Sequence, residues 1–185
     1  VFQMDETSEL SKQTDELLGT LDERDAQKDK YMTFKSGSEY FGLKIQYVNE
    51  IIQFQAITAI PETEEYIKGL INLRGKVIPV IDVRLRFKQE PFEYNDRTCI
   101  IVISVKSTVV GLIVEEIAEV VEIRDKNILP PPTIGNADKL HHKYVYGIGK
   151  VGDTVKLLLD PDKLINDEEL EAADQGNEAN NEEGD

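Results

Sequence analysis

The chain is poor in the side chains that most often carry chemistry. It holds a single cysteine, Cys99, and only two histidines, His141 and His142, which are neighbours. Adjacent side chains point to opposite sides of an extended segment, and no cysteine or third histidine lies nearby, so we expect no metal site. Cys99 stands in the apolar run TCIIVIS, where we expect it to behave as a small buried hydrophobe in a reducing compartment.

Catalytic motifs are also missing. No serine stands in a G-x-S-x-G pattern, and no glycine-rich loop of the Walker or dinucleotide-binding type follows a predicted strand. The carboxylate pairs Glu64-Glu65 and Glu115-Glu116 are sequence neighbours, which point apart on a strand and rarely form an acid/base pair. We therefore expect no enzyme and no cofactor.

Long apolar runs are absent as well. No stretch approaches the ~20 apolar residues that a membrane-spanning helix needs, and no basic, apolar and small-residue pattern of a signal sequence opens the chain. The sequence therefore predicts a soluble cytoplasmic protein that does not insert into a membrane.

Charge is concentrated at the two ends of the chain. Residues 1–30 hold nine acidic and four basic side chains, and residues 166–185 hold nine acidic and none basic, so residues 31–165 carry one of the fifteen net negative charges. Nucleic acids and anionic membrane surfaces require clustered lysine and arginine, so neither is expected as a partner. We expect a flexible extension over 1–30, a folded domain over 31–165 and a largely disordered tail over 166–185.

The segment GLINLRGKVIPVIDVRLRF, residues 69–87, predicts a β-hairpin. Its apolar positions are rich in β-branched residues, which suit a half-buried strand. Gly75 supplies the positive φ of a tight Arg-Gly turn. Pro79 cannot donate to a strand ladder, so we expect the second strand to lie at a sheet edge or to carry a bulge. A free strand edge is a docking surface for another protein.

The sequence contains an internal repeat. FGLKIQYVNEII, residues 41–52, aligns with VGLIVEEIAEVV, residues 110–121, and the hairpin over 69–82 has a weaker counterpart in GIGKVGDTVKLLLD, residues 147–160. Asp82 and Asp160 end the equivalent hairpins, which favours a turn or a helix cap. Two copies of one β-unit with frequent turns indicate an all-β fold of two small barrels. Each copy has little interior of its own, so we expect the two to share a core.

Four segments together resemble the CheW family of bacterial chemotaxis coupling proteins. They are YFGLKIQYVNEII, GLINLRGKVIPVIDVRLRF, DRTCIIVISVKSTVVGLIVEEIAEVVEI and GIGKVGDTVKLLLDPDKLINDEE, which occur in the family's order over about residues 30–170. The resemblance implies two SH3-like five-stranded barrels packed around a shared core, with short helical connections. It also implies a cytoplasmic, non-enzymatic adaptor, recruited to membrane receptor arrays, that bridges chemoreceptor tips to a histidine autokinase. The kinase's regulatory domain has the same double-barrel fold.

The resemblance also implies two partner sites. A groove between the barrels receives the receptor's helical hairpin, and the matching positions are Ile45, Val48, Arg74, Cys99 and Ile100. Apolar side chains suit an amphipathic helix, and Arg74 can add a charge-assisted hydrogen bond. The alternative for Ile45, Val48 and Ile100 is an ordinary place in the barrel core, and for Arg74 it is a solvated turn.

Kinase docking is implied on the first barrel, around the strand of Glu50 and the stretch IIQFQAITAIPETEEYIKG. The matching positions are Glu50, Phe54, Ile57 and Gly69. Glu50 has a counterpart, Glu119, in the second copy, so a structural role common to both barrels is the alternative.

Two other functions remain open at this point. The chain can be the same adaptor domain within a larger regulatory protein, although the acidic tail up to Asp185 shows no linker pattern. It can also be a carrier or hydrolase of small molecules that uses the groove between the barrels, although no pair of nucleophile and base is visible.

Overall fold

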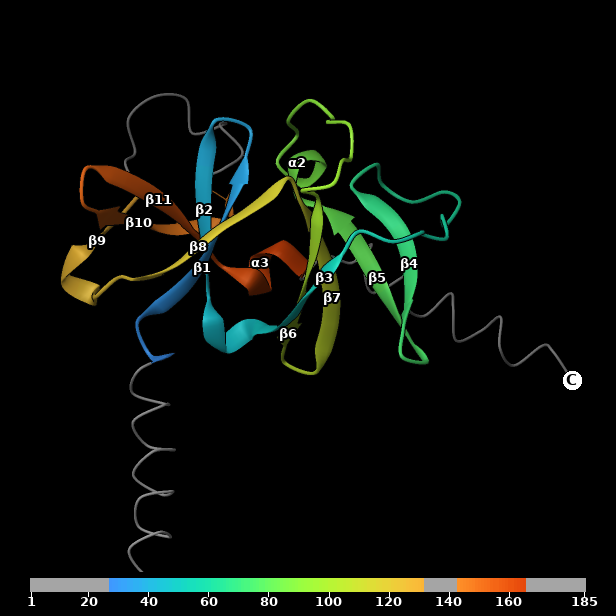
Figure 1. The fold of residues 1–185 in the computed structure, drawn as a ribbon, viewed down its shortest axis with the longest axis horizontal. Coiled ribbons are helices and arrows are strands. Elements are labelled where there is room, and N and C mark those ends of the chain that lie inside the picture. The colour runs from blue at the N-terminus through green and yellow to red at the C-terminus, as the bar shows by residue number, and fades with distance from the viewer. Residues whose placement is uncertain (1–26, 132–142, 166–185) are drawn as a thin grey trace, which may run out of the picture.

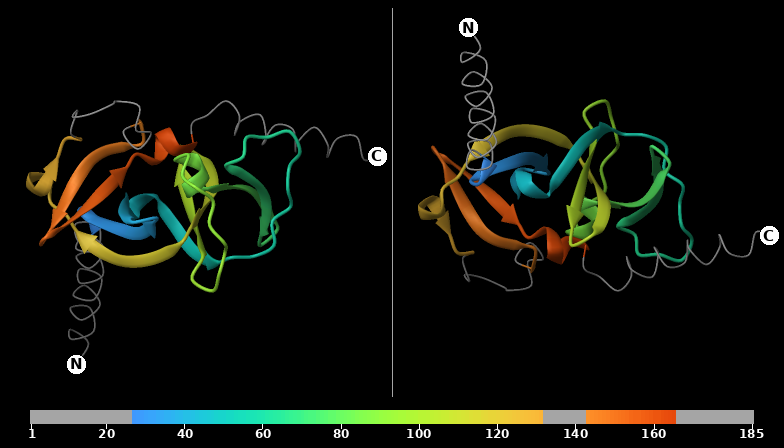
Figure 2. Two further views of the ribbon diagram at one scale, coloured as in Figure 1. Left: turned by 90° about the horizontal axis from the view of Figure 1, so that it is seen from above. Right: turned by 90° about the horizontal axis from the view of Figure 1, so that it is seen from below.

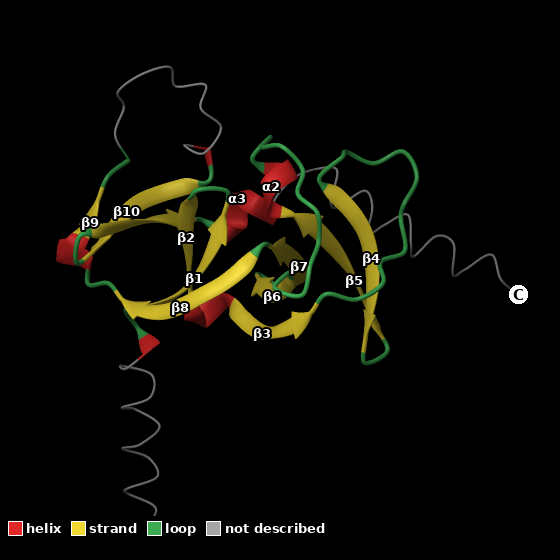
Figure 3. Ribbon diagram, turned by 45° about the horizontal axis from the view of Figure 1, so that its top comes forward, coloured by secondary structure: helices red, strands yellow, loops and turns green. Residues whose placement is uncertain are grey.

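The structure is a computed structural model that describes residues 27–131 and 143–165. Most of the expected flexible extension, the expected disordered tail, and His141 and His142 lie outside these residues. Strands dominate, and the helices are short (Figure 3). The strands are β1 (Lys30–Ser36), β2 (Glu39–Lys44), β3 (Val48–Gln53), β4 (Ile67–Leu73), β5 (Lys76–Asp82), β6 (Cys99–Val105), β7 (Thr108–Val114), β8 (Glu116–Glu122), β9 (Ile128–Leu129), β10 (Val145–Val151) and β11 (Thr154–Leu159). The helices are η1 (Ile45–Tyr47), α2 (Val83–Arg86), η2 (Asp125–Asn127) and α3 (Pro161–Ile165).

The strands form two curved sheets that lie side by side (Figure 1). The six-stranded barrel has the order β8-β1-β2-β11-β10-β9, and the five-stranded barrel has the order β3-β6-β7-β5-β4. Each therefore combines strands from both sequence repeats, because β8 of the second repeat pairs with β1 of the first and β3 of the first pairs with β6 of the second. Figure 2 shows strands from opposite ends of the chain, β2 and β11, side by side in parallel pairing.

Three apolar clusters hold the fold together. The largest contains buried side chains from both sheets and from the short helices, among them Phe34, Leu112 and Leu164. It confirms the expected shared core, and its burial is the main favourable term for folding. Two smaller clusters fill the barrels themselves. One surrounds Ile100 in the five-stranded barrel, and the other surrounds Tyr31 in the six-stranded barrel.

The predicted hairpin is β4–β5, and its turn is as expected. Arg74 and Gly75 have φ angles of 51° and 85°, the two positive values that a type I′ turn requires. The expectation for Pro79 was wrong: β5 lies inside the sheet between β7 and β4, and the register shift falls between Ile67 and Gly69. Proline is accommodated because the pairing of β5 with β7 begins only at Val80.

The caps predicted for the two hairpin ends are confirmed. The Asp82 carboxylate accepts hydrogen bonds from the amides of Arg84 and Leu85 at the start of α2. The Asp160 carboxylate accepts one from the amide of Asp162 at the start of α3. Each carboxylate satisfies amides that have no partner within the helix. Both helices then turn apolar side chains into the shared core.

Candidate functional site

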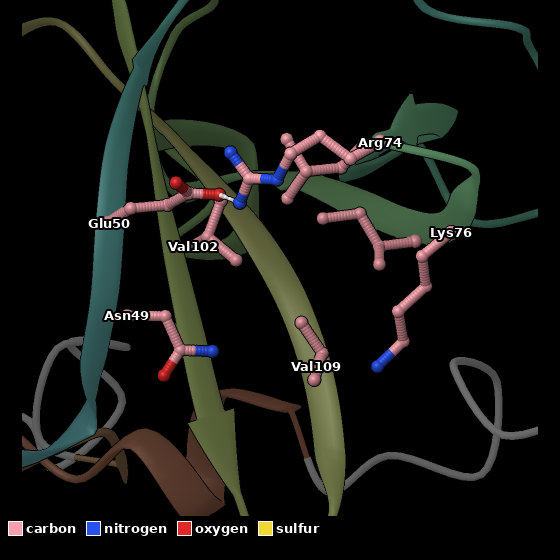
Figure 4. Close-up of a pocket in the computed structure, with 8 residues that line it drawn as sticks. Asn49, Glu50, Arg74, Lys76, Val102 and Val109 are labelled. Atoms are coloured by element: carbon pink, nitrogen blue, oxygen red, sulfur yellow. Dashed lines mark hydrogen bonds and ion pairs between the residues drawn. The ribbon is translucent and has the colours of Figure 1, made fainter.

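The two edges of the five-stranded barrel are joined by an ion pair. Strand β3 is one edge of the sheet and β4 is the other, and β3 carries Glu50 whereas the β4–β5 turn carries Arg74. The Arg74 guanidinium donates to the Glu50 carboxylate over 2.5 Å (Figure 4). The side chain of Arg74 is 73 % exposed and that of Glu50 is 28 % exposed. A residue expected to contact the receptor and one expected to contact the kinase are therefore direct partners.

A cavity of about 340 Å³ lies beneath this pair. Its lining combines polar groups with apolar side chains from four strands and the hairpin turn: Asn49, Glu50, Leu73, Arg74, Lys76, Ile78, Val102 and Val109. Val102 and Val109 lie on β6 and β7 between the two edges, with Arg74 and Lys76 on the hairpin side (Figure 4). The sequence reasoning missed Asn49, Lys76 and Val109, because no local pattern shows that the two edges meet.

The expected receptor contacts do not form one compact cluster. Val48 and Cys99 are half-buried against the shared core, at opposite ends of the β3–β6 ladder, about 16 Å apart at the usual rise per residue. Ile45 is half-buried in η1, and Arg74 lies at the hairpin turn. These residues span the length of β3 rather than a single pocket.

Ile100 is fully buried in the small cluster of the five-stranded barrel. Its Cγ2 lies 2.8 Å from the place where a Cβ on Gly111 would stand, so the neighbouring strand closes tightly over it. This position favours the alternative of an ordinary core residue, because the side chain presents no surface to a partner.

Cys99 is half-buried, less deeply than its apolar run suggested. Its thiol donates a weak hydrogen bond to the carbonyl of Arg97 over 3.3 Å. Burial raises the pKa of the Cys99 thiol above its ordinary value, which lowers its thiolate fraction and its nucleophilicity at neutral pH.

Phe54 and Ile57 lie on the β3–β4 connection and are half-buried against the small cluster of the five-stranded barrel. The ring of Phe54 contacts that of Tyr94 with centroids 4.6 Å apart. The Tyr94 hydroxyl donates to the Asp82 carboxylate over 2.6 Å, and burial together with this bond raises the pKa of Tyr94. Phe54 is therefore packed against Tyr94, which in turn is hydrogen-bonded to Asp82, the residue that caps α2.

Gly69 is buried where the β3–β4 connection crosses β4. Thr58 and Leu70 exchange two backbone hydrogen bonds of 2.9 Å, and a Cβ on Gly69 would stand 2.0 Å from the carbonyl oxygen of Thr58. The φ of Gly69 is 140°, which side chains rarely allow. Gly69 therefore permits the close approach of two backbones, which is a structural role.

The free strand edge is not where the hairpin prediction placed it. Strand β5 is internal, and the edge of β4 is partly covered by the bridge between Thr58 and Leu70. Strand β3 is the other edge of the sheet, and its side chains alternate between half-buried and exposed, with Ile51 39 % exposed. An exposed β-branched residue on an edge strand favours contact with another protein.

Glu119, the counterpart of Glu50, lies in a different setting. Its backbone carbonyl accepts a hydrogen bond from the Thr33 hydroxyl, and among the described residues its side chain forms no ion pair. The position that corresponds to Arg74 in the β10–β11 turn is Gly152. The ion pair is therefore a feature of the five-stranded barrel alone, which argues against a structural role common to both barrels.

The described residues contain no group of three or more histidine, cysteine, aspartate or glutamate side chains that could hold a metal ion. Among the same residues, no helix has the length and hydrophobicity to cross a membrane.

Known proteins resemble this chain over the same region. The family model of the CheW-like domain matches residues 30–169. The chemotaxis protein CheW of Klebsiella aerogenes is 34 % identical over 78 % of this chain and 86 % of its own length. The chemotaxis protein CheW of Rhizobium meliloti is 33 % identical over 77 % of this chain and 90 % of its own.

The fold is likewise found in a solved structure. The crystal structure of the scaffolding protein TtCheW from Thermoanaerobacter tengcongensis superposes with a TM-score of 0.69 at 36 % identity, over 76 % of this chain and 94 % of that one. A family model that covers most of the chain, relatives above 30 % identity and a similar solved structure agree. The chain belongs to the CheW-like domain family.

Proposed function

We propose that this chain is a non-enzymatic adaptor that couples chemoreceptors to a histidine autokinase in bacterial chemotaxis. The observation that carries this proposal is the Arg74–Glu50 pair, which joins the strand of the expected kinase contacts to the turn of the expected receptor contact within a CheW-like fold. An adaptor requires two binding surfaces on one rigid body, and the two sheets share one core.

The receptor contact is proposed along β3 and the hairpin turn. Ile45 and Val48 expose part of an apolar surface beside the shared core, and Cys99 lies at the far end of the same ladder. An amphipathic helical hairpin can lie along this line, because its apolar residues recur on one face. Arg74 is the charged group at one side of that line, and its guanidinium would donate hydrogen bonds to a carboxylate of the helix.

The kinase contact is proposed at the edge of β3 and on the connection that follows it. Glu50 and Ile51 lie on the edge strand, and Phe54 and Ile57 support the connection from below. In this arrangement Gly69 acts indirectly, because it lets the connection lie close to β4. The kinase's regulatory domain has a fold of the same kind by resemblance, so edge-to-edge contacts between similar barrels are expected.

The same proposal places the protein in the cytoplasm, recruited to receptor arrays at the membrane through its partners. Partner binding without chemistry is supported by the similar solved structure, which is that of a scaffolding protein.

A two-partner titration tests this function. The isotopically labelled protein is titrated separately with a receptor-tip helical hairpin and with a kinase regulatory domain while backbone amide signals are followed. We expect the receptor fragment to shift signals near Val48 and Arg74, and the kinase domain to shift signals between Glu50 and Gly69. Failure of both partners to shift any signal would exclude the adaptor function.

A further inference from the structure

The internal repeat allows each barrel to be compared with the other at matching positions. The parallel pair of Val80 with Gly111 corresponds to the pair of Leu158 with Gly42, and the two small clusters occupy the interiors of the two barrels at matching places. In the same alignment the cavity-lining residues of the five-stranded barrel have the following counterparts in the six-stranded barrel: Val109 corresponds to Tyr40, Ile78 to Lys156, and Val102 to Thr33.

In the six-stranded barrel the side chains at these positions contact one another or the backbone. Lys156 is only 5 % exposed, and its ammonium lies 4.2 Å from the centre of the Tyr40 ring. Such a contact between a cation and an aromatic face is attractive. Thr33 is fully buried and hydrogen-bonded to the backbone of Glu119. The Tyr40 ring, itself 38 % exposed, therefore covers the Lys156 ammonium on this barrel, and Thr33 lies buried at the position that corresponds to Val102.

In the five-stranded barrel the same place is open. Val109 stands at the position that corresponds to Tyr40 in the other barrel, so the aromatic ring that covers the site there is missing here. Val102, Val109 and Ile78 form an apolar lining, and Arg74 and Lys76 bring cationic groups to the rim. Figure 4 shows that both side chains start from the hairpin side, and that the Arg74 guanidinium reaches across to Glu50 whereas Lys76 stays on the hairpin side.

From this comparison we propose that the cavity of the five-stranded barrel receives one aromatic side chain of the protein partner that binds beside Arg74. The ring occupies the place that Tyr40 fills in the six-stranded barrel. Arg74 and Lys76 then supply the cationic contact that Lys156 supplies there. The proposal rests on the proposed function, since the ring belongs to a protein partner, and it adds the chemistry that this partner must present.

The test uses p-cresol, the side-chain analogue of tyrosine, with 3-methyl-1-butanol as an aliphatic control of similar polarity. Methyl signals of the labelled full chain are followed during titration. We expect p-cresol to shift the methyl signals of Val102, Val109 and Ile78, and the aliphatic alcohol to shift them much less. Absence of these shifts up to the solubility limit of p-cresol would overturn the proposal.

Two variants place a tyrosine at the matching position of the five-stranded barrel and remove it from that of the six-stranded barrel. Val109→Tyr fills the cavity with the residue that the other barrel carries, so p-cresol should no longer shift Val102 and Ile78. Tyr40→Val opens the matching place, so p-cresol should now shift Leu158 and Val151. Unchanged amide signals away from the substituted site confirm that each variant is folded. Equal p-cresol binding by the wild type and Val109→Tyr would contradict the assigned place.

The partner titrations separate this proposal from the proposed function. With Val109→Tyr, the receptor fragment, which is the partner proposed to bind beside Arg74, should bind about tenfold more weakly or worse, as expected for the loss of a buried aromatic anchor. If neither partner binds the wild type, the proposed function fails whatever p-cresol does. If both bind the wild type and Val109→Tyr equally, only the present proposal fails. In that case p-cresol binding would indicate a free aromatic ligand instead.

Discussion

At the residue scale, Gly69 is the position where the structure most clearly requires a glycine. Its φ of 140° and the carbonyl of Thr58 leave no room for a Cβ. We expect Gly69→Ala to lower the free energy of unfolding by about 3 kcal/mol or more, because strain and backbone displacement add. Chemical denaturation measures this loss.

Gly152→Ala is the matched control for that substitution. Gly152 also has a positive φ, 58°, but no atom lies within 4 Å of its ideal Cβ position. Its replacement should cost only about 1 kcal/mol, the price of the left-handed conformation. Equal losses for the two variants would show that the contact with Thr58 does not matter.

Arg74 tests the receptor contact at the same scale. Its side chain is 73 % exposed, so its ion pair with Glu50 contributes less than about 1 kcal/mol to stability. We expect Arg74→Glu to weaken receptor binding about tenfold or more, since charged anchors dominate such interfaces, and to leave the melting temperature nearly unchanged.

Arg124→Glu controls for the reversal of an exposed charge. The side chain of Arg124 is 65 % exposed and lies 3.4 Å from Glu122, which ends β8 in the six-stranded barrel. An Arg74→Glu variant that binds the receptor fragment as tightly as Arg124→Glu would contradict the proposed contact.

Several residue roles could be predicted because they depend on neighbours in sequence. Asp82, Asp160 and Gly75 act at turns, and their chemistry is local. The burial of Ile100 and the pairing of Arg74 with Glu50 could not be predicted, because both depend on strands that are distant in sequence.

At the scale of elements, the segment between α2 and β6 closes one end of the five-stranded barrel. Phe92 and Tyr94 on this segment pack against the small cluster, and Tyr94 binds the carboxylate that caps α2. The guanidinium of Arg84 donates to the carbonyl of Glu90 over 2.7 Å and to the carboxylate of Glu115. The segment between α2 and β6 therefore contacts the β3–β4 connection through the rings of Tyr94 and Phe54. Through Arg84 it also contacts Glu115, which lies between β7 of one barrel and β8 of the other.

Alkaline pH should loosen this arrangement. Burial raises the pKa of Tyr94 and Tyr146 in the folded protein, and hydrogen bonds to Asp82 and Tyr31 add to the effect. The protonated phenols are therefore favoured in the folded state. Their contribution to stability is present below the ordinary pKa of about 10 and is lost as pH rises above it.

Urea unfolding at about pH 9 and about pH 11 measures this loss. The decrease in the free energy of unfolding between the two values should be smaller in Tyr94→Phe than in the wild type. Tyr40→Phe, which changes a tyrosine outside this segment, should retain the full decrease. A decrease that is the same in all three proteins would contradict the role given to Tyr94.

The prediction of elements was accurate where a pattern lies within one segment. The hairpin over 69–82 was recognised from its β-branched residues and its Arg-Gly turn. The position of β5 was mistaken because Pro79 excludes only a donor, and the parallel partner of β5 begins one residue later. The order of strands in a sheet is a long-range property that a single proline does not determine.

At the scale of the whole molecule, the two sequence repeats do not correspond to the two barrels. The hairpin β1–β2 lies in the sheet of β8–β11, and the hairpin β6–β7 lies in the sheet of β3–β5, so each sheet is completed only by a hairpin of the other repeat. The repeat in the sequence predicted two β-units and a shared core, but it could not show this exchange, because both arrangements bury the same apolar positions.

The exchange predicts that neither half folds alone. A fragment that ends at Glu90 holds β1–β5, and a fragment that begins at Pro91 holds β6–β11. Each should lack a cooperative thermal transition by circular dichroism, and the mixture should regain one, because the shared core requires both. A cooperative transition in either isolated fragment would show that one repeat is sufficient for folding.

We propose that one molecule of this protein holds a receptor and a kinase domain at the same time. Sedimentation velocity of a receptor-tip helical hairpin mixed with a kinase regulatory domain, with and without this chain, tests it directly. We expect a ternary complex that forms only when the chain is present and that decreases with Arg74→Glu. Binary complexes that exclude each other, with no ternary species, would contradict it.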